Sequence, residues 1–164
     1  MTTAIVRHPR HAMRGRYAHL MAMYADNYWR LTRVFGPDRL AAGDYRSSVG
    51  DGLDLLLRMD SRRPYTLEFT LSYAMRDQDS GCPDPSASLR LYRDARLAEV
   101  LACDGARRIE DAIGRHAPPE AVVSHRLRMN AFLGKWLEYL EEHGHSRFSL
   151  VSASPIARVA SSSG

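Results

Sequence analysis

Lysine is nearly absent from this sequence, because Lys135 is the single lysine among 23 basic residues and the other 22 are arginine. Against 19 acidic residues this leaves a formal net charge of +4. Guanidinium groups suit phosphates well, but an arginine bias this strong also follows from a GC-rich coding sequence. The charge therefore permits a nucleic-acid partner without requiring one.

Cysteine is also scarce. Cys82 and Cys103 have no CxxC spacing, which argues against a thiolate metal site or a disulfide framework and fits reduced thiols in a cytoplasm. The sequence lacks a run of about 18 apolar residues, which a membrane span needs, and it lacks the apolar centre of a signal peptide. We therefore expect a cytoplasmic protein that does not enter a membrane.

The motifs that carry common chemistries are missing too. There is no Gly-x-Ser-x-Gly elbow, no glycine-rich phosphate loop and no HExxH pair, and the seven histidines never take metal-ligand spacing within the predicted core. We expect no catalytic residue, no metal and no cofactor, so an enzyme is the less favoured class.

What is present is an ordinary globular composition. A chain of 164 residues with 45% apolar residues can bury one core of normal size. We expect a flexible basic arm over residues 1–14, a single α+β domain over residues 15–144, and a disordered tail over residues 145–164, which is rich in serine and small residues.

Two stretches have the apolar period of a helix. The first spans residues 17–35 and stops at Gly36-Pro37; the second begins at 119 or 124 and runs to 143, before Gly144 as a cap. We expect Trp136 to anchor the second helix in the core. The first apolar stripe contains Tyr17, Leu20, Met21, Tyr24, Tyr28, Leu31, Val34 and Phe35, and the second contains Met129, Phe132, Leu133, Trp136, Leu137 and Leu140.

Between the helices the apolar period changes to two, which is typical of half-buried strands. Residues 65–73 alternate most clearly, residues 53–59 less so, and residues 45–49 weakly. A second hairpin pairs residues 88–93 with 96–102 around Asp94-Ala95. This register places Arg90 opposite Glu99 and Tyr92 opposite Leu97. Residues 106–119 fit either a sixth strand or a short helix.

The predicted order is therefore α-β-β-β-β-β-α. It describes an α+β fold in which an N-terminal and a C-terminal helix pack on an antiparallel sheet of about five strands.

The stretches Arg90-Leu-Tyr-Arg-Asp-Ala-Arg-Leu-Ala-Glu-Val100 and Asn130-Ala-Phe-Leu-Gly-Lys-Trp-Leu-Glu-Tyr-Leu140 resemble the YqiB-like family of bacterial proteins, a domain of unknown function. The resemblance covers residues from about Met23 to Gly144. It implies a bacterial cytoplasmic protein of similar fold with no established activity. The chain has Arg93 where the family has histidine, so the resemblance brings no catalytic histidine to this hairpin.

The second predicted hairpin holds the best polar cluster of the sequence, in Arg90, Tyr92, Asp94 and Glu99. These side chains could bind an anion or a ribose hydroxyl. The alternative is structural, with a cross-strand ion pair between Arg90 and Glu99 and with Asp94 capping the turn.

Two asparagines, Asn27 and Asn130, lie at or beside the apolar stripes, where a buried amide needs partners. They could contact a ligand or each other, or they could tie each helix to a neighbouring backbone.

Nucleic-acid contacts could come from Arg62 and Arg63 in one turn and from Arg107 and Arg108 after the second hairpin. The tyrosines that could stack on bases share the apolar face that the helices should cover, which argues against this hypothesis.

By exclusion, the sequence favours a non-enzymatic binding or accessory module that holds a protein partner or forms a homodimer. RNA binding through the scattered arginines is the first alternative, and a small-molecule enzyme or ligand-binding protein for a charged substrate is the second. The side of the sheet that the helices leave bare should discriminate between them. An apolar face predicts a protein partner, a basic one RNA, and a concave polar one a ligand.

Overall fold

The computed structural model describes residues 9–75, 78–79, 85–103, 107–108, 114 and 116–153. Side chains are described from Ala12 onward, except those of Arg107 and Arg108. The elements are the helices α1 (Pro9–Val34), η1 (Pro37–Arg39, 3-10) and α3 (Pro119–Glu142) and the strands β1 (Gly43–Ser47), β2 (Leu55–Arg62), β3 (Thr66–Tyr73), β4 (Ser86–Tyr92), β5 (Leu97–Cys103), β6 (Arg107–Arg108) and β7 (Leu150–Ser152).

The strands form one antiparallel sheet in the order β6-β5-β4-β3-β2-β1-β7. The α+β class is confirmed. The five expected strands are β1 to β5, and two short strands extend the sheet at its edges. Over residues 106–119 the sequence fits either a sixth strand or a short helix. Arg107 and Arg108 pair with β5 as the strand β6, while residues 106, 109–113 and 115 lie outside the described residues.

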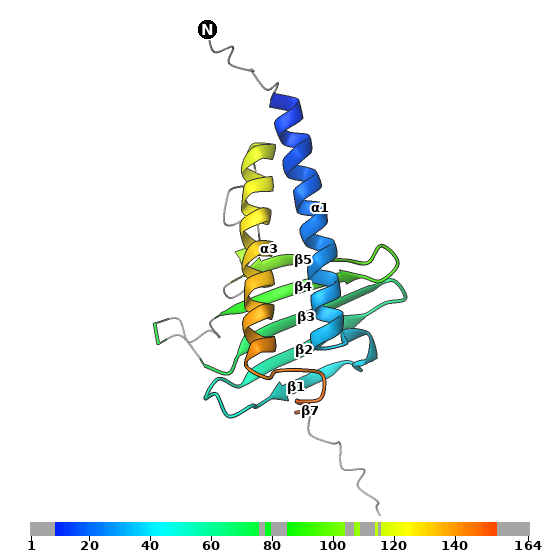
Figure 1. Ribbon diagram of the computed structural model, residues 1–164, viewed down its shortest axis with the longest axis vertical. Helices are drawn as coiled ribbons and strands as arrows, with labels where there is room; N and C mark the ends of the chain where they lie inside the picture. Colours follow the sequence, from blue (N-terminus) through cyan, green and yellow to red (C-terminus); the bar gives the residue numbers. More distant parts are fainter. Residues whose placement is uncertain are drawn as a thin grey trace, which may run out of the picture.

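Both helices cross the same face of the sheet, and their N-terminal halves extend beyond β5 (Figure 1). They run in the same direction, because their contacts keep a constant offset of 108 residues. Arg16 bonds Ser124, Arg30 bonds Glu138 at 2.6 Å, and Arg33 bonds Glu141 at 2.8 Å. Among the described helices, none is both long and apolar enough to cross a bilayer.

The core fills the space between the helices and the strands. The almost fully buried residues are Leu31 of α1, Phe35 just after α1, Leu133 and Leu137 of α3, and the inward residues of the central strands. On β2 to β4 the inward residues alternate with outward ones that, apart from Leu56, are polar, as expected for an antiparallel sheet with one solvated face. These inward residues are Leu55, Leu57, Met59, Leu67, Phe69, Leu71, Ala87, Leu89 and Leu91.

The predicted register of the second hairpin is confirmed, with Arg90 opposite Glu99 and Tyr92 opposite Leu97. Two predicted helix ends are confirmed as well. Gly36 follows α1 with φ 55° and Gly144 follows α3 with φ 92°, a left-handed conformation that glycine adopts without steric cost. In each case a backbone N–H returns to the last turn, as His145 N does to Leu140 O at 3.0 Å.

Three apolar residues expected in the core are exposed: Tyr17, Phe132 and Tyr65. Tyr17 belongs to the part of α1 that extends beyond the sheet, and Tyr65 lies in the turn before β3. A helical or alternating period fixes which face a side chain takes, but it does not ensure that another element covers that face.

The two terminal boundaries also need correction. Residues 9–14 are already part of α1, so the expected arm is helical there, and residues 1–8 lie outside the described residues. Residues 145–153 are ordered rather than a disordered tail, because His145 is buried and β7 pairs with β1. Residues 154–164 lie outside the described part.

Candidate functional site

The predicted polar cluster on the second hairpin forms, but with different partners. Arg90 pairs mainly with Glu68 of β3 at 2.8 Å and reaches Glu99 only at 3.9 Å. Glu99 instead accepts hydrogen bonds from the Tyr92 hydroxyl at 2.7 Å and from Arg126 of α3 at 3.1 Å. The fourth predicted member, Asp94, lies exposed in the turn.

The pKa shifts in this cluster come from burial and from hydrogen bonds between its own members. Burial, followed by the hydrogen bond with Glu99, raises the pKa of Tyr92. Burial also raises the pKa of Tyr24 on α1, which accepts a hydrogen bond from Arg126 at 3.4 Å. For Arg126 burial acts to lower the pKa, but Tyr24 and Glu99 outweigh it and the pKa is raised. The cluster thus joins α1, α3 and the strands β3 to β5 through groups that already have partners.

The two buried asparagines tie the helices together and to the sheet. Asn27 Nδ2 donates to the backbone oxygen of Asn130 at 3.0 Å, and Asn130 Oδ1 accepts the backbone N–H of Val100 at 3.1 Å. Asn130 Nδ2 also donates to Arg126 O at 2.8 Å. The helices approach closely here, since a Cβ on Gly134 would lie 3.2 Å from Asn27 Oδ1. The contacts match the structural alternative, in which asparagines bind neighbouring backbone.

A histidine network holds the C-terminal segment, and the sequence reasoning missed it. His145 Nδ1 lies 2.8 Å from Ser47 Oγ, and His145 Nε2 lies 3.3 Å from Asp51 Oδ2. The hydrogen bond from the Leu53 N–H is the main cause that holds the pKa of Asp51 below its usual value; burial opposes it, and the hydrogen bond with His145 adds to the lowering. The residue types are those of a hydrolase triad, yet Ser47 is fully buried and has no route to a substrate. The network therefore serves to attach the segment.

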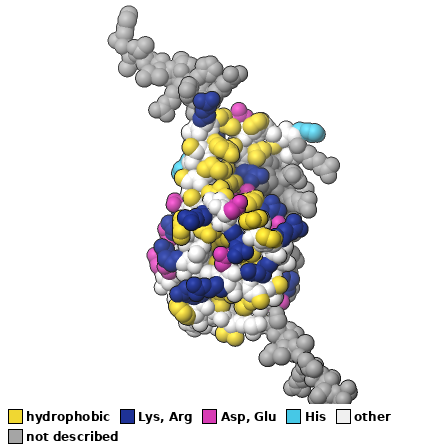
Figure 2. Space-filling model, turned by 90° about the vertical axis from the view of Figure 1, so that its right-hand side faces the viewer, with side chains coloured by type: hydrophobic (Ala, Val, Ile, Leu, Met, Phe, Trp, Pro, Cys, Tyr) yellow, Lys and Arg dark blue, Asp and Glu magenta, His cyan; other side chains and the backbone are white. Residues whose placement is uncertain are grey.

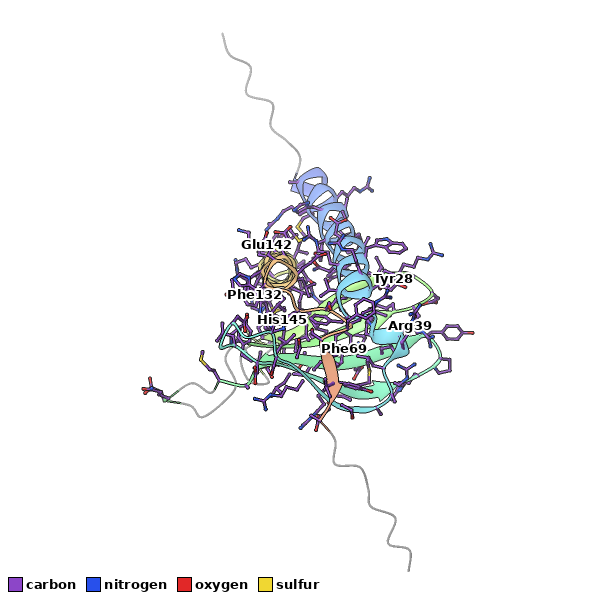
Figure 3. The ribbon with its side chains drawn as sticks, turned by 60° about the horizontal axis from the view of Figure 1, so that its bottom comes forward. Tyr28, Arg39, Phe69, Phe132, Glu142 and His145 are labelled. Carbon is purple, nitrogen blue, oxygen red and sulfur yellow. The ribbon has the colours of Figure 1, made fainter. Side chains whose placement is uncertain are left out.

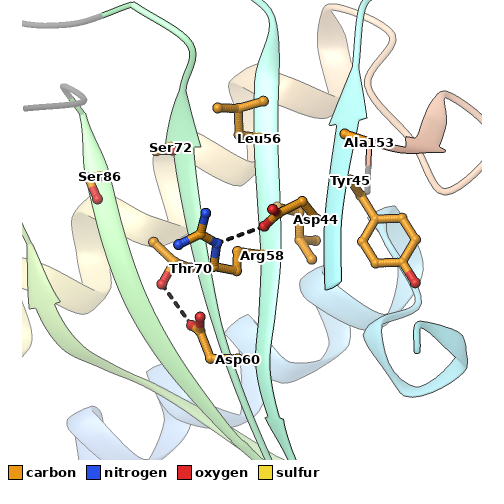
Figure 4. Close-up of a pocket in the computed structure, with 10 residues that line it drawn as sticks. Asp44, Tyr45, Leu56, Arg58, Asp60, Thr70, Ser72, Ser86 and Ala153 are labelled. Carbon is orange, nitrogen blue, oxygen red and sulfur yellow. Dashed lines mark hydrogen bonds and ion pairs between the residues drawn. The ribbon is translucent and has the colours of Figure 1, made fainter. Parts of the chain in front are cut away.

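The sheet face away from the helices is polar and hollowed. A hollow of about 460 Å³ lies over β1 to β4 and contains both acidic and basic side chains (Figure 4). Arg58 donates to Asp44 at 2.7 Å, and the Thr70 hydroxyl donates to Asp60 at 3.0 Å. The uncovered face is thus neither apolar nor predominantly basic.

Exposed aromatic rings and arginines gather on another side of the molecule. Trp29 comes from α1, Arg39 ends η1, Arg63 and Tyr65 lie between β2 and β3, and Arg96 lies between β4 and β5. We call these five residues the basic aromatic edge. Both turns lie on the right of Figure 1, and Figure 2 shows Lys or Arg side chains interleaved with hydrophobic ones over that side.

Short contacts hold the segments of this edge next to one another. Arg93 pairs with Asp38 of η1 at 2.7 Å and donates to Pro64 O at 3.1 Å, so it joins η1 to both turns. Arg62 donates to the backbone oxygen of Asp38 at 2.9 Å. The Arg96 guanidinium lies 5.9 Å from the centre of the Trp29 ring. Arg62, a predicted nucleic-acid contact, thus has a structural role here.

The remaining groups of the edge face solvent. Trp29 is 54% exposed and Tyr65 is 68% exposed, and Arg39 also points outward near the end of the sheet (Figure 3). Among the described residues, no carboxylate forms a salt bridge with Arg39, Arg63 or Arg96. The edge therefore offers unneutralised guanidinium groups beside accessible rings.

The backbone at Arg96 adds a second observation. Arg96 has φ 55° and is the only non-glycine residue with a positive φ in the described part of the chain. This left-handed conformation costs an ordinary side chain about 1 kcal/mol, and glycine would avoid that cost. The sequence has an arginine where the backbone favours glycine, and that arginine lies over an exposed tryptophan.

The remaining predicted nucleic-acid contacts lie in β6, and the sequence predicts no metal site. Arg107 and Arg108 form β6, but their side chains lie outside the described part of the chain. Within the described residues, no group of three or more histidine, cysteine, aspartate or glutamate side chains could hold a metal ion.

Comparison with known proteins identifies a family but no characterised relative. The family model described as a protein of unknown function, DUF1249, matches residues 30–146, which is well over half of the chain. No curated protein and no solved structure matches the chain.

Proposed function

Since the chain belongs to the DUF1249 family, whose function is unknown, we propose a function from its own surface: a binding module that holds single-stranded nucleic acid on the basic aromatic edge. The observation that carries this proposal is the combination of Trp29 and Tyr65, both largely exposed, with three arginines that form no salt bridge to any described carboxylate. Single-stranded nucleic acid is bound by this combination, because rings stack on bases while cations follow the backbone.

The contrast with the rest of the surface supports the proposal. Several arginines in other described parts of the surface are neutralised, as Arg30 is by Glu138 and Arg46 is by Asp54 at 2.5 Å. An ordinary solvated surface exposes scattered single apolar residues. On the basic aromatic edge the exposed rings instead lie beside several arginines, which is a less common arrangement. Stacking would use the flat faces of the rings, and the three guanidinium groups would contact phosphates.

The protein-partner hypothesis from the sequence is less favoured by this geometry. That hypothesis, reached by exclusion, predicted an apolar uncovered sheet face, whereas this face carries Asp44, Arg58, Asp60 and Thr70. The resemblance to the YqiB-like family and the absence of CxxC spacing support a bacterial cytoplasmic setting, which forms part of the proposal.

The test is binding of fluorescein-labelled oligouridine and oligothymidine 12-mers, measured by fluorescence anisotropy. Trp29→Ala should weaken binding about 5- to 150-fold, because base stacking on an aromatic ring is worth about 1–3 kcal/mol. Arg96→Gly should also weaken it. Because glycine suits the left-handed backbone at this position, a loss in Arg96→Gly cannot come from strain.

Arg128→Ala is the matched control, because it removes an exposed arginine from α3 away from the edge and should leave affinity unchanged. The proposal fails if Trp29→Ala and Arg96→Gly bind as the unmodified protein does. Equal affinity for polyglutamate, insensitive to Trp29→Ala, would instead indicate an acidic protein partner.

A further inference from the structure

The hollow on the uncovered sheet face is separate from the basic aromatic edge and has its own chemistry. Its polar side chains come from alternate residues of the neighbouring strands β1 to β4, on the sheet face away from the helices. The volume of about 460 Å³ lies within the range of small-molecule sites, roughly 300–1,000 Å³. Its polar side chains are Asp44, Arg58, Asp60, Thr70, Ser72 and Ser86.

The charges in the hollow do not balance. Among the described residues that line it, two carboxylates, Asp44 and Asp60, accompany one guanidinium group, that of Arg58. Arg58 is directed to Asp44 at 2.7 Å, and among the described residues no cation forms a salt bridge with Asp60. On a chain whose net charge is +4, this hollow is therefore locally acidic. Asp60 is the carboxylate best able to accept a further cation.

Hydroxyl groups occupy the side of the hollow opposite Asp44. Thr70 and Ser72 lie on β3, and Ser86 lies on β4 directly across from Ser72. Each hydroxyl can both donate and accept a hydrogen bond. The Leu56 side chain from β2 adds an apolar surface between these groups (Figure 4).

We propose that this hollow binds a small polyhydroxylated amine, whose ammonium group pairs with Asp60 while its hydroxyls bond the serine and threonine hydroxyls. An ammonium ion corrects the local excess of negative charge, and a neutral polyol does not. A phosphate ester is disfavoured by the same two carboxylates. The site does not depend on nucleic-acid binding at the basic aromatic edge.

The experiment is a titration of the full chain, labelled with nitrogen-15, with glucosamine as the probe. N-acetylglucosamine is the matched ligand, because it has the same ring without the cationic amine. We expect glucosamine to shift the amide resonances of β1 to β4 at the hollow and N-acetylglucosamine to bind about two- to fivefold more weakly, because it lacks the exposed ion pair. Equal affinity for the two sugars, or shifts confined to other regions, would overturn the proposal.

Two variants locate the interaction. Asp60→Asn should weaken glucosamine about two- to fivefold, the range for one exposed ion pair, and Ser86→Tyr should abolish binding by filling the hollow. Asp94→Asn makes the same charge change in an exposed turn and should bind normally. Unfolding of each variant is checked in the same amide spectra. Unchanged binding in folded Asp60→Asn and Ser86→Tyr would refute the site, whatever the result with oligonucleotides.

Discussion

The two tryptophans of the chain occupy opposite environments. Trp136 is 5% exposed, donates from Nε1 to the Tyr73 hydroxyl at 3.0 Å and meets the Tyr73 ring edge-on at 5.5 Å. Trp29 faces solvent and contacts Tyr28 edge-on at 5.4 Å. The contribution of an aromatic ring to stability grows with its buried area. Trp136 should therefore contribute to stability, and Trp29 should contribute to binding.

Trp136→Ala should therefore lower the free energy of unfolding by about 3–5 kcal/mol, since it opens a cavity and leaves a buried tyrosine hydroxyl without its donor. Trp29→Ala should change it by less than about 0.5 kcal/mol. Urea unfolding followed by circular dichroism measures both. Similar losses in the two variants would contradict the assignment of Trp29 to binding.

At the scale of elements, the segment after α3 is held to the sheet through few contacts. Ser47 Oγ lies 2.6 Å from Ser149 Oγ and 2.8 Å from His145, and Ala153 N donates to Asp44 O at 2.8 Å. β7 adds only three residues to the sheet edge, and short edge strands have little pairing energy of their own. The buried histidine should therefore determine whether this segment stays attached.

His145→Ala should lower the free energy of unfolding by about 1–3 kcal/mol, because it leaves the buried Ser47 hydroxyl without the histidine partner. Amide hydrogen exchange should rise in residues 146–153 and β1, with little change in α1. His143→Ala is the control, because His143 is exposed and lies two residues earlier. A uniform rise across the sheet and helices, or no change in residues 146–153, would contradict this role.

At the scale of the whole molecule, charge is separated between surfaces. On the uncovered sheet face, Arg46 and Arg58 pair with aspartates, whereas the three arginines of the basic aromatic edge form no salt bridge with any carboxylate in the described part of the chain. A net charge of +4 spread evenly would attract polyanions only weakly. The arginines gathered on the basic aromatic edge should create a local positive potential that attracts phosphate groups.

Oligonucleotide affinity should therefore depend on salt with a moderate slope. Three phosphate contacts to a single strand predict a fall of roughly 20-fold in the association constant between 50 and 200 mM salt, from a slope of about −0.7 per contact. Anisotropy titrations at several salt concentrations measure this slope, and Arg63→Ala should reduce it. A slope near zero would mean that the edge makes no phosphate contacts. A slope that corresponds to eight or more phosphate contacts would require basic residues beyond the edge.

The sequence alone determined the local features of this protein. The change from a helical period to a period of two places the helices and the five main strands, because each pattern is complete within one element. The Arg90 and Glu99 register follows from a short turn, and Gly36 and Gly144 mark helix ends through their backbone freedom. Trp136 was predicted in the core because its own stripe includes it.

Only the tertiary structure decided which of these elements meet. The Arg126 contact with Glu99, the His145 contact with Ser47 and the approach of Arg96 to Trp29 join residues far apart in the sequence, which no local period encodes. Tyr65 follows the pattern of its strand but lies beyond the elements that would cover it, so it is exposed. The basic aromatic edge was invisible in the sequence for this reason: its arginines and rings come from four segments, and packing alone brings them together.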